Sequence, residues 1–301
     1  MPKICYIEKN FRRESLELID KINSVISEYD LQGYSLTLRQ AYYQLVARGV
    51  IPNNERSYKN VGSLINDARL AGLIDWHSIE DRTRNLQSLS HWSSPKSIIE
   101  SASYQYRKDI WEDQDYYIEV WVEKEALANI VGRVANDLDV PYFCCRGYVS
   151  QSEMWSASQR LKAKQECGKY CVILHLGDHD PSGIDMSRDI EERLNLFGVI
   201  PEMFIFRRIA LNMNQIEEFA PPPNPAKLTD SRYGSYIQKF GYESWELDAL
   251  EPKVIHDLIT DNVTEFWDFD LVVKVREKVR SEKLVMEAVA NDWDKIYDEY
   301  R

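Results

Sequence analysis

Three acidic residues in the middle of the chain have the types and spacing of ligands for a divalent metal ion. Glu123 directly follows the apolar stretch Ile118–Val122, and Asp178 and Asp180 follow the apolar stretch Tyr170–Leu176. Acids two positions apart in an extended chain point to the same side, so Asp178 and Asp180 can reach one ion. Oxygen ligands without a nearby cysteine favour Mg²⁺, with Mn²⁺ as the alternative, over zinc. Such an ion stabilises negative charge on a phosphoryl group during transfer.

The same acids have a second interpretation as helix caps, because Asp is common at helix starts. Gly177 and Gly183 flank the pair and are typical of a tight turn at the end of a strand. An Asp-x-Asp pair alone is weak support for a metal site. The longer pattern Asp-x-Asp-Pro-x-Gly after an apolar strand, with Glu123 ending an earlier strand, favours the metal site over capping.

Alternating strand and helix patterns predict the scaffold that carries these acids. Strands are expected at Ile118–Val122, Pro141–Cys145, Tyr170–Leu176 and Met203–Ile209, and helices at Lys124–Leu138, Gln151–Lys164 and Ser182–Leu196. This alternation indicates an α/β fold with a Rossmann-like, mostly parallel four-stranded sheet. Sites in such sheets form at the carboxyl ends of the strands. We expect residues 111–301 to form this domain, with a helical C-terminal extension.

The first part of the chain, residues 1–110, has the pattern of a winged-helix (CAP-like) DNA-binding module. Apolar residues recur at helical spacing over Leu18–Tyr29. A second helix opens at Thr37, which begins a capping box, and should end at Gly49. A third helix is expected over Glu55–Ala71, followed by a polar hairpin or wing over Asp75–Arg84.

Polar residues of this module are candidates for contacts to the DNA backbone. On the third helix these residues lie opposite the apolar stripe, and they are Arg56, Lys59, Ser63 and Asn66. On the expected wing, Arg82 and Arg84 alternate onto one side and could reach a backbone phosphate. A solvated helix face is the alternative interpretation.

Tyr43 on the second expected helix is the candidate nucleophile. It lies about 100° round the helix from the apolar residue Tyr42, at the edge of the buried stripe. Arg39 precedes Tyr43 by four residues, so the two side chains share a face. A cation beside a phenol stabilises the phenolate and can hold a phosphate next to it. From these residues alone, a surface tyrosine beside an arginine is the simpler interpretation.

The order of these motifs resembles a known domain. Glu123, then Gly147, then Asp178–Asp180 is the layout of the Toprim domain of topoisomerases, primases and some nucleases. The sequence Val-Glu-Lys-Glu-Ala at Val122–Ala126, with Asp-x-Asp-Pro-x-Gly-Ile at Asp178–Ile184, is similar to the A subunit of type IIB topoisomerases (topoisomerase VI) and the meiotic protein Spo11. The resemblance covers roughly the first two thirds of the chain. By this resemblance the protein would be a compact version of the A subunit.

The resemblance implies Mg²⁺-dependent cleavage of double-stranded DNA by transesterification. Tyr43 would be the nucleophile, assisted by Arg39, and would form a 5′-phosphotyrosyl link. Glu123 would take part in catalysis and would hold the metal together with Asp178 and Asp180. In the family the tyrosine of one protomer meets the metal of the other, which implies a homodimer.

Two other functions stay open. The first is a hydrolytic, metal-dependent Toprim endonuclease, in which water attacks the phosphate. The second is a DNA-binding protein without catalysis. The chain is shorter than the usual A subunit, has Gln40 where an acid is common, and contains no ATPase-like segment. A separate ATPase, the B-type subunit, is therefore an open question as a partner.

Composition narrows the class of protein. The net charge of −12 counts against non-specific coating of nucleic acid, although local basic clusters still bind phosphate. Five cysteines without a Cys-x-x-Cys pattern indicate reduced thiols, and the apolar runs are too short to cross a membrane. These features predict a cytoplasmic protein, nucleoid-associated or, in a eukaryote, nuclear.

The remaining segments give weaker expectations. The polar stretch Leu86–Trp111 predicts a linker between the two modules. In the last part of the chain, Glu246 and Asp248 are interpreted as helix caps, with a role in orienting the metal site as the alternative.

Overall fold

Four parallel strands form the central sheet of the computed structural model, which describes residues 3–79 and 89–301. Their order is β2-β1-β3-β4. The strands are β1 (Tyr116–Val122), β2 (Tyr142–Cys144), β3 (Tyr170–Leu176) and β4 (Phe204–Ala210). The parallel, Rossmann-like sheet expected from the alternation of strands and helices is therefore confirmed.

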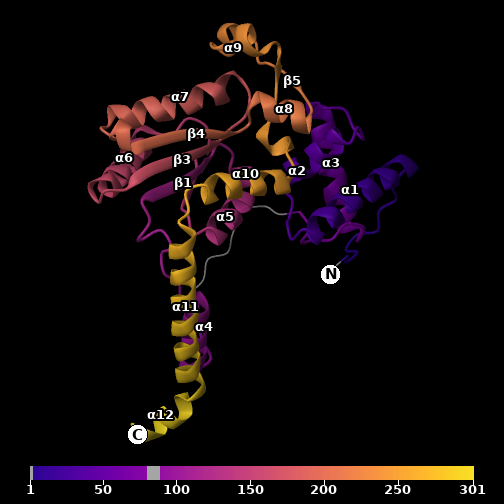
Figure 1. The fold of residues 1–301 in the computed structure, drawn as a ribbon. Helices are drawn as coiled ribbons and strands as arrows, with labels where there is room; N and C mark the ends of the chain where they lie inside the picture. Colours follow the sequence, from indigo (N-terminus) through magenta and orange to yellow (C-terminus); the bar gives the residue numbers. More distant parts are fainter. Residues whose placement is uncertain (1–2, 80–88) are drawn as a thin grey trace.

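Helices cover both faces of this sheet (Figure 1). One face packs on α5 (Ala128–Asp137) and α10 (Pro252–Thr264), and the other packs on α6 (Gln151–Glu166) and α7 (Pro181–Leu196). Alternate residues of a strand face opposite sides, so Val120 and Trp121 belong to different cores. A strand buried on both sides is apolar throughout, which explains why β3 reads as one continuous apolar run.

The N-terminal module contains three helices around their own core, namely α1 (Arg13–Leu31), α2 (Leu38–Ala47) and α3 (Glu55–Leu70). The capping box at the start of α2 is confirmed, because Gln40 N–H donates to Thr37 Oγ1 at 3.3 Å and Gln40 Oε1 accepts from Thr37 N–H at 2.9 Å. Gly49 follows the end of α2 with φ of 65°, the left-handed conformation expected after a helix.

The expected wing is not confirmed. After α3, residues 71–79 make only isolated bridges, Cys5 with Ala71 and Leu36 with Ile79. Arg82 and Arg84 lie outside the described residues. The three-helix arrangement is thus observed, and the winged-helix assignment stays a prediction.

Two helices form an arm that projects from the rest of the chain (Figure 1). They are α4 (Pro95–Gln105) and α11 (Phe269–Asn291), which run antiparallel, since Tyr106 Oη donates to Glu282 Oε2 at 2.7 Å and Ser103 Oγ donates to the Lys283 carbonyl at 3.3 Å. The segment Leu86–Trp111, expected to link the two modules, contains α4, which the sequence did not predict. α4 is short and polar, and its helical conformation is supported by packing on α11, which is remote in sequence.

Shorter elements complete the C-terminal part. They are the helices α8 (Met213–Phe219), α9 (Tyr233–Phe240) and α12 (Trp293–Glu299), the short strands β5 (Asn224–Pro225) and β6 (Glu243–Ser244), and a 3₁₀ helix, η3 (Leu247–Ala249). None of the described helices combines the length and apolar character needed to cross a membrane.

His175 on β3 couples folding to pH. Its Nδ1 lies 3.0 Å from Ser187 Oγ, and burial, with the charge on Arg208, lowers its pKa to about 3. Because the pKa in the unfolded chain is about 6.5, stabilisation by the neutral ring is complete above that pH and is lost as pH falls toward 3. At pH 5 this loss lowers the free energy of unfolding by about 2 kcal/mol.

We expect the His175→Gln variant to lose less unfolding free energy than wild type between pH 6.5 and pH 4, as measured by urea titration. The exposed His77→Gln should leave that slope unchanged, and equal slopes for all three proteins would contradict the assignment.

Candidate metal centre and tyrosine cavity

Asp178 lies in the turn after β3, where the ends of two strands meet. Its backbone N–H donates to Glu123 Oε2 at 2.9 Å, and its own Oδ1 accepts from Leu247 N–H at 2.7 Å. Glu123 follows β1, which pairs with β3 along its whole length. Parallel pairing thus brings Glu123 and Asp178 together at the carboxyl edge of the sheet, as the sequence predicts.

Asp180 is the N-cap of α7. Its Oδ1 accepts from Gly183 N–H at 2.6 Å and from Ser182 Oγ at 3.0 Å. Capping, one of the two interpretations of this acid, is therefore observed. Gly183 permits the tight turn, because a Cβ there would lie 2.3 Å from the carbonyl oxygen of Asp178. The aspartates after β3 thus point in different directions, since Asp178 faces Leu247 while Asp180 closes the start of α7.

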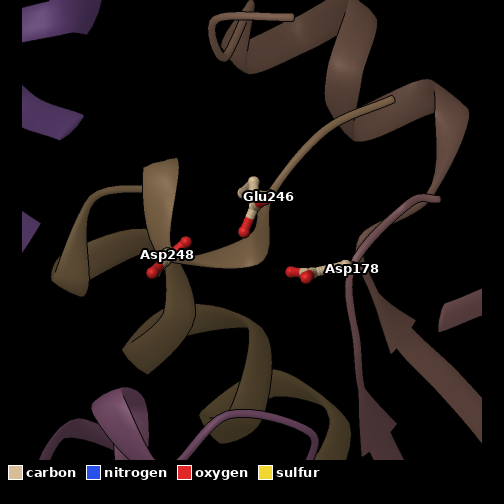
Figure 2. Close-up of side chains that lie close together, drawn as sticks. All are labelled: Asp178, Glu246 and Asp248. Atoms are coloured by element: carbon tan, nitrogen blue, oxygen red, sulfur yellow. The ribbon is translucent and has the colours of Figure 1, made fainter. Parts of the chain in front are cut away.

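One group of acids includes two residues, Glu246 and Asp248, that the sequence did not identify as metal ligands. Among the described residues, ligand oxygens of Asp178, Glu246 and Asp248 all lie within 4.8 Å of one another. Figure 2 shows Asp178 pointing from the end of β3 toward the segment that carries the other two. Glu246 precedes η3 and makes no side-chain cap bond, so the capping interpretation of Glu246 is wrong. The alternative from the sequence, a role in orienting the metal site, stays a prediction.

Two basic side chains lie against this acidic cluster. Lys124 Nζ lies 2.9 Å from Asp178 Oδ1 and 3.0 Å from Asp248 Oδ1, and it also pairs with Glu246. Arg39, from α2, has Nη2 2.6 Å from Glu246 Oε2 and Nε 2.8 Å from Asp248 Oδ2. The cluster therefore joins the N-terminal module to the sheet. Lys124 follows Glu123 directly, and its neighbours gave no reason to assign it a role from sequence.

Burial and mutual repulsion shift the proton affinities of the cluster. Burial, together with Glu123, Glu246 and Asp248, outweighs Lys124 and raises the pKa of Asp178 to about 8. Burial also raises the pKa of Glu123. Burial would lower the pKa of Lys124, but the surrounding carboxylates outweigh it and raise that pKa, so the amine stays charged. The ammonium therefore compensates only part of the negative charge.

The donor set fits a divalent cation of the Mg²⁺ class. Five carboxylates occupy this region, namely Glu123, Asp178, Asp180, Glu246 and Asp248. Three basic side chains accompany them, namely Arg39, Lys124 and Arg208. With every group ionised, the formal charge of the region is −2. One divalent ion would balance that charge, and the ligand atoms are all oxygens. Asp178, Glu246 and Asp248 would hold it. Lys124 already lies among the same oxygens, so a metal has to displace it.

Lys124 should therefore compete with metal. We expect Lys124→Ala to raise the affinity for Mn²⁺ by about tenfold or more, because removing the ammonium leaves the same oxygens free for the metal. The metal-free variant should also have a lower melting temperature, which Mg²⁺ restores. Calorimetric titration with Mn²⁺ measures the first effect, with Lys124→Arg as the control that keeps the cation. Equal Mn²⁺ affinities for wild type and Lys124→Ala would contradict the assignment.

A cavity of about 430 Å³ joins the N-terminal module to the acidic turn. Tyr43 and Arg39 line it from α2, and Asp180, Glu246 and Lys227 line it from the C-terminal part. The sequence resemblance implies that the tyrosine meets the metal of a partner protomer. Here the tyrosine and the acids line one cavity of a single chain.

The environment of Tyr43 keeps its phenol protonated. The residue is only 7% exposed, and burial, followed by Glu246 and Asp248, raises its pKa to about 12. The Arg39 guanidinium carbon lies 5.7 Å from the ring centre and acts in the opposite direction. The shared face expected for Arg39 and Tyr43 is thus observed, but Arg39 also pairs with two acids.

Tyr42 has a structural role. Its Oη accepts from Asn54 N–H at 2.9 Å and lies 3.0 Å from Asn53 Oδ1. Asn54 is the N-cap of α3, so Tyr42 links α2 to the start of the next helix. Tyr42→Phe should therefore leave activity unchanged, while stability should fall by about 1–2 kcal/mol through the lost hydrogen bonds.

The expected DNA-contacting residues of α3 lie on its exposed face. These residues are Arg56, Lys59, Ser63 and Asn66. Lys59 forms an exposed ion pair with Glu55 at 2.7 Å. The helix therefore presents this polar face to solvent, as the periodicity predicts, and its contact with DNA remains a prediction.

His179, between the two aspartates, positions the segment that carries Glu246. Its backbone exchanges two hydrogen bonds of 2.9 Å with the backbone of Trp245. Its Nδ1 lies 2.8 Å from Tyr236 Oη, and burial lowers its pKa to about 4, so the ring is neutral at physiological pH. This histidine is a support for the acidic cluster and not one of its ligands.

Comparison with protein-family models and with curated proteins found no match.

Proposed function

We propose that this protein is a Mg²⁺-dependent enzyme that cleaves DNA by transesterification to Tyr43, like the topoisomerase A subunits that its motifs resemble. One observation carries the proposal. A single cavity brings Tyr43 and Arg39 beside Asp180 and Glu246, next to an acidic cluster suited to a divalent ion. A phenol, a guanidinium and grouped carboxylates are the components that phosphoryl transfer to tyrosine requires.

The proposed step forms a bond between Tyr43 Oη and a DNA phosphorus. The bond from phosphorus to the 3′-oxygen breaks, which leaves a 3′-hydroxyl and a 5′-phosphotyrosyl link. The phenol proton has to leave to solvent as the new bond forms, and the departing 3′-oxygen takes up a proton from solvent to become the hydroxyl. Arg39 orients the phosphate beside the ring. A bound Mg²⁺ would stabilise the charge that develops on the phosphate oxygens.

Hydrolysis is the second candidate, and the state of Tyr43 favours it. A pKa of about 12 and an exposed fraction of 7% make the phenol a weak nucleophile in this conformation. In a hydrolytic nuclease, water would attack the phosphate and Tyr43 would only line the cavity. Transesterification requires Arg39 to leave its acidic partners for a phosphate.

The proposed partner is double-stranded DNA, cut by a homodimer. Two copies related by a twofold axis would make one break in each strand. A separate B-type ATPase subunit is a further candidate partner, by resemblance alone.

A plasmid assay tests the proposal and separates the candidates. Supercoiled DNA is incubated with protein and Mg²⁺, and the reaction is quenched with detergent, with and without protease. Transesterification predicts linear or nicked DNA that enters the gel normally only after protease treatment. Cleavage independent of protease indicates hydrolysis, and retarded but uncut plasmid indicates a binding protein without catalysis.

A further inference from the structure

We infer that the base of the arm formed by α4 and α11 binds the phosphate backbone of duplex DNA. This site lies outside the tyrosine cavity and is separate from the face of α3 that the sequence predicts to contact DNA. The choice of DNA as the ligand rests on the proposed function, whereas the affinity for phosphate follows from the charges of the arm itself. The arm projects from the rest of the chain, so an extended partner can reach its base (Figure 1).

A cavity of about 300 Å³ lies at the arm base, where α11 meets the segment after α4 and the end of α5. Its lining carries four basic side chains, Arg107, Lys108, Arg276 and Lys283, and two acidic ones, Asp137 and Asp139. The tyrosine cavity has the opposite balance, with two basic and three acidic side chains in its lining. The arm base therefore attracts a phosphate, whereas the metal-free tyrosine cavity repels it.

The basic charge continues along α11. Residues 274–283 contain five basic and two acidic side chains, in a chain whose net charge is −12. Arg280 follows Arg276 by four residues, so the two side chains share one face of the helix. These ten residues span roughly 15 Å of helix, a length over which duplex DNA presents about four phosphates on each strand. The basic run is thus long enough to contact several phosphates.

Three exposed arginines at the arm base have no carboxylate partner among the described residues. They are Arg107, Arg276 and Arg280. Arg276 stacks on Trp267 instead, with its guanidinium carbon 5.4 Å from the ring centre. An arginine without an ion pair can bind phosphate oxygens without first breaking a contact to an acid.

Two lysines of the arm base share one carboxylate. Lys108 Nζ lies 3.3 Å from Glu282 Oε1, and Lys278 lies close to both of these side chains. Glu282 also accepts from Tyr106 Oη at 2.7 Å. One negative charge thus faces two ammonium groups, and a phosphate would compensate the excess positive charge.

The test measures binding of a duplex oligonucleotide of about 30 base pairs by fluorescence anisotropy, without divalent metal so that no cleavage occurs. Wild type should bind, and its affinity should fall steeply as KCl increases. Combined Arg107→Gln, Arg276→Gln and Arg280→Gln should raise Kd at least about tenfold. The slope of log Kd against log KCl should fall by about 3, roughly 0.9 for each lost phosphate contact. Lys283 stays unchanged, because its Nζ donates to the Tyr104 carbonyl at the end of α4.

A matched control removes the same number of charges elsewhere. Combined Arg13→Gln, Lys21→Gln and Arg188→Gln changes exposed residues of α1 and α7, and this variant should bind as wild type does. Lysine at the three arm positions should keep most of the salt dependence, because the charge remains. Equal losses in the arm and control variants, an unchanged slope in the arm variant, or a wild type that binds no duplex overturns the inference.

Thermal melting identifies an arm variant that is destabilised by losing the stacking of Arg276 on Trp267. In that case Arg107→Gln with Arg280→Gln, which keeps the stacked pair, should lower the slope by about 2. An unchanged slope in this variant also overturns the inference.

The same proteins separate this inference from the proposed function. If the arm variant loses binding while wild type makes no break in plasmid DNA with Mg²⁺, the phosphate site is supported and the proposed cleavage is contradicted. If wild type cleaves DNA but the arm variant binds the duplex as tightly, the arm site is overturned and the cleavage stands. Polyglutamate, a probe for an acidic protein partner, should not displace the duplex at an equal concentration of charge. Displacement under that condition would overturn the choice of DNA.

Discussion

Replacing Tyr43 by phenylalanine should abolish cleavage of plasmid DNA and the covalent protein–DNA link, while the protein stays folded. The change removes the one oxygen that can bond to phosphorus and leaves the ring in its place beside Arg39. The cost in unfolding free energy should be no more than about 1 kcal/mol, the value of one neutral hydrogen bond. Detergent-quenched plasmid cleavage and denaturing gels for the adduct measure the effect.

Tyr42→Phe is the matched control for that experiment. Tyr42 contributes its hydroxyl to the start of α3, so this variant should lose stability but retain cleavage at temperatures where it is folded. Arg39→Ala should slow cleavage without eliminating it, because Arg39 assists and does not form the bond. If Tyr43→Phe cuts DNA at the wild-type rate, the hydrolytic candidate replaces transesterification.

Replacing Asp178 by asparagine should remove metal binding and cleavage together. Asp178 belongs to the triad of acids suited to the ion, and its backbone N–H also holds Glu123. Loss of its charge should lower cleavage by roughly a thousandfold and remove the rise in melting temperature caused by Mg²⁺. The metal-free variant should stay folded, because asparagine keeps the shape and relieves repulsion among buried acids.

Glu192→Gln on α7 is the control for loss of an acid outside the cluster, since Glu192 forms an exposed pair with Arg188. It should bind Mn²⁺ and cleave DNA as wild type does. Retained cleavage in Asp178→Asn, with Mn²⁺ affinity also unchanged, would show that this acidic cluster is not the metal centre. Glu123→Gln and Asp180→Asn then test the ligand set expected from sequence.

Local patterns in the sequence were sufficient for the scaffold. The continuous apolar run of β3 and the alternation of strands with helices determined a parallel sheet, because strands buried on both faces must be apolar and parallel strands need crossover helices. The capping box at Thr37 and the glycine after α2 determined the limits of that helix, because caps act on the backbone next to them. Glu123 and Asp178 followed from the rule that strand ends meet at one edge of the sheet.

Contacts between distant segments were decided only by the tertiary structure. Glu246 lies far from Asp178 in the chain, and no local pattern distinguishes it from an ordinary loop acid until the backbone pairing of His179 with Trp245 brings the segments together. The position of Lys124 among the carboxylates, and the ion pairs of Arg39 with Glu246 and Asp248, also depend on how distant segments pack. α4 also depends on a remote partner, because a short polar helix is marginal alone and becomes stable by packing on α11. The periodicity of the sequence predicts which face of its own helix or strand a residue occupies. Ion pairs between distant residues depend on how the helices and strands pack together.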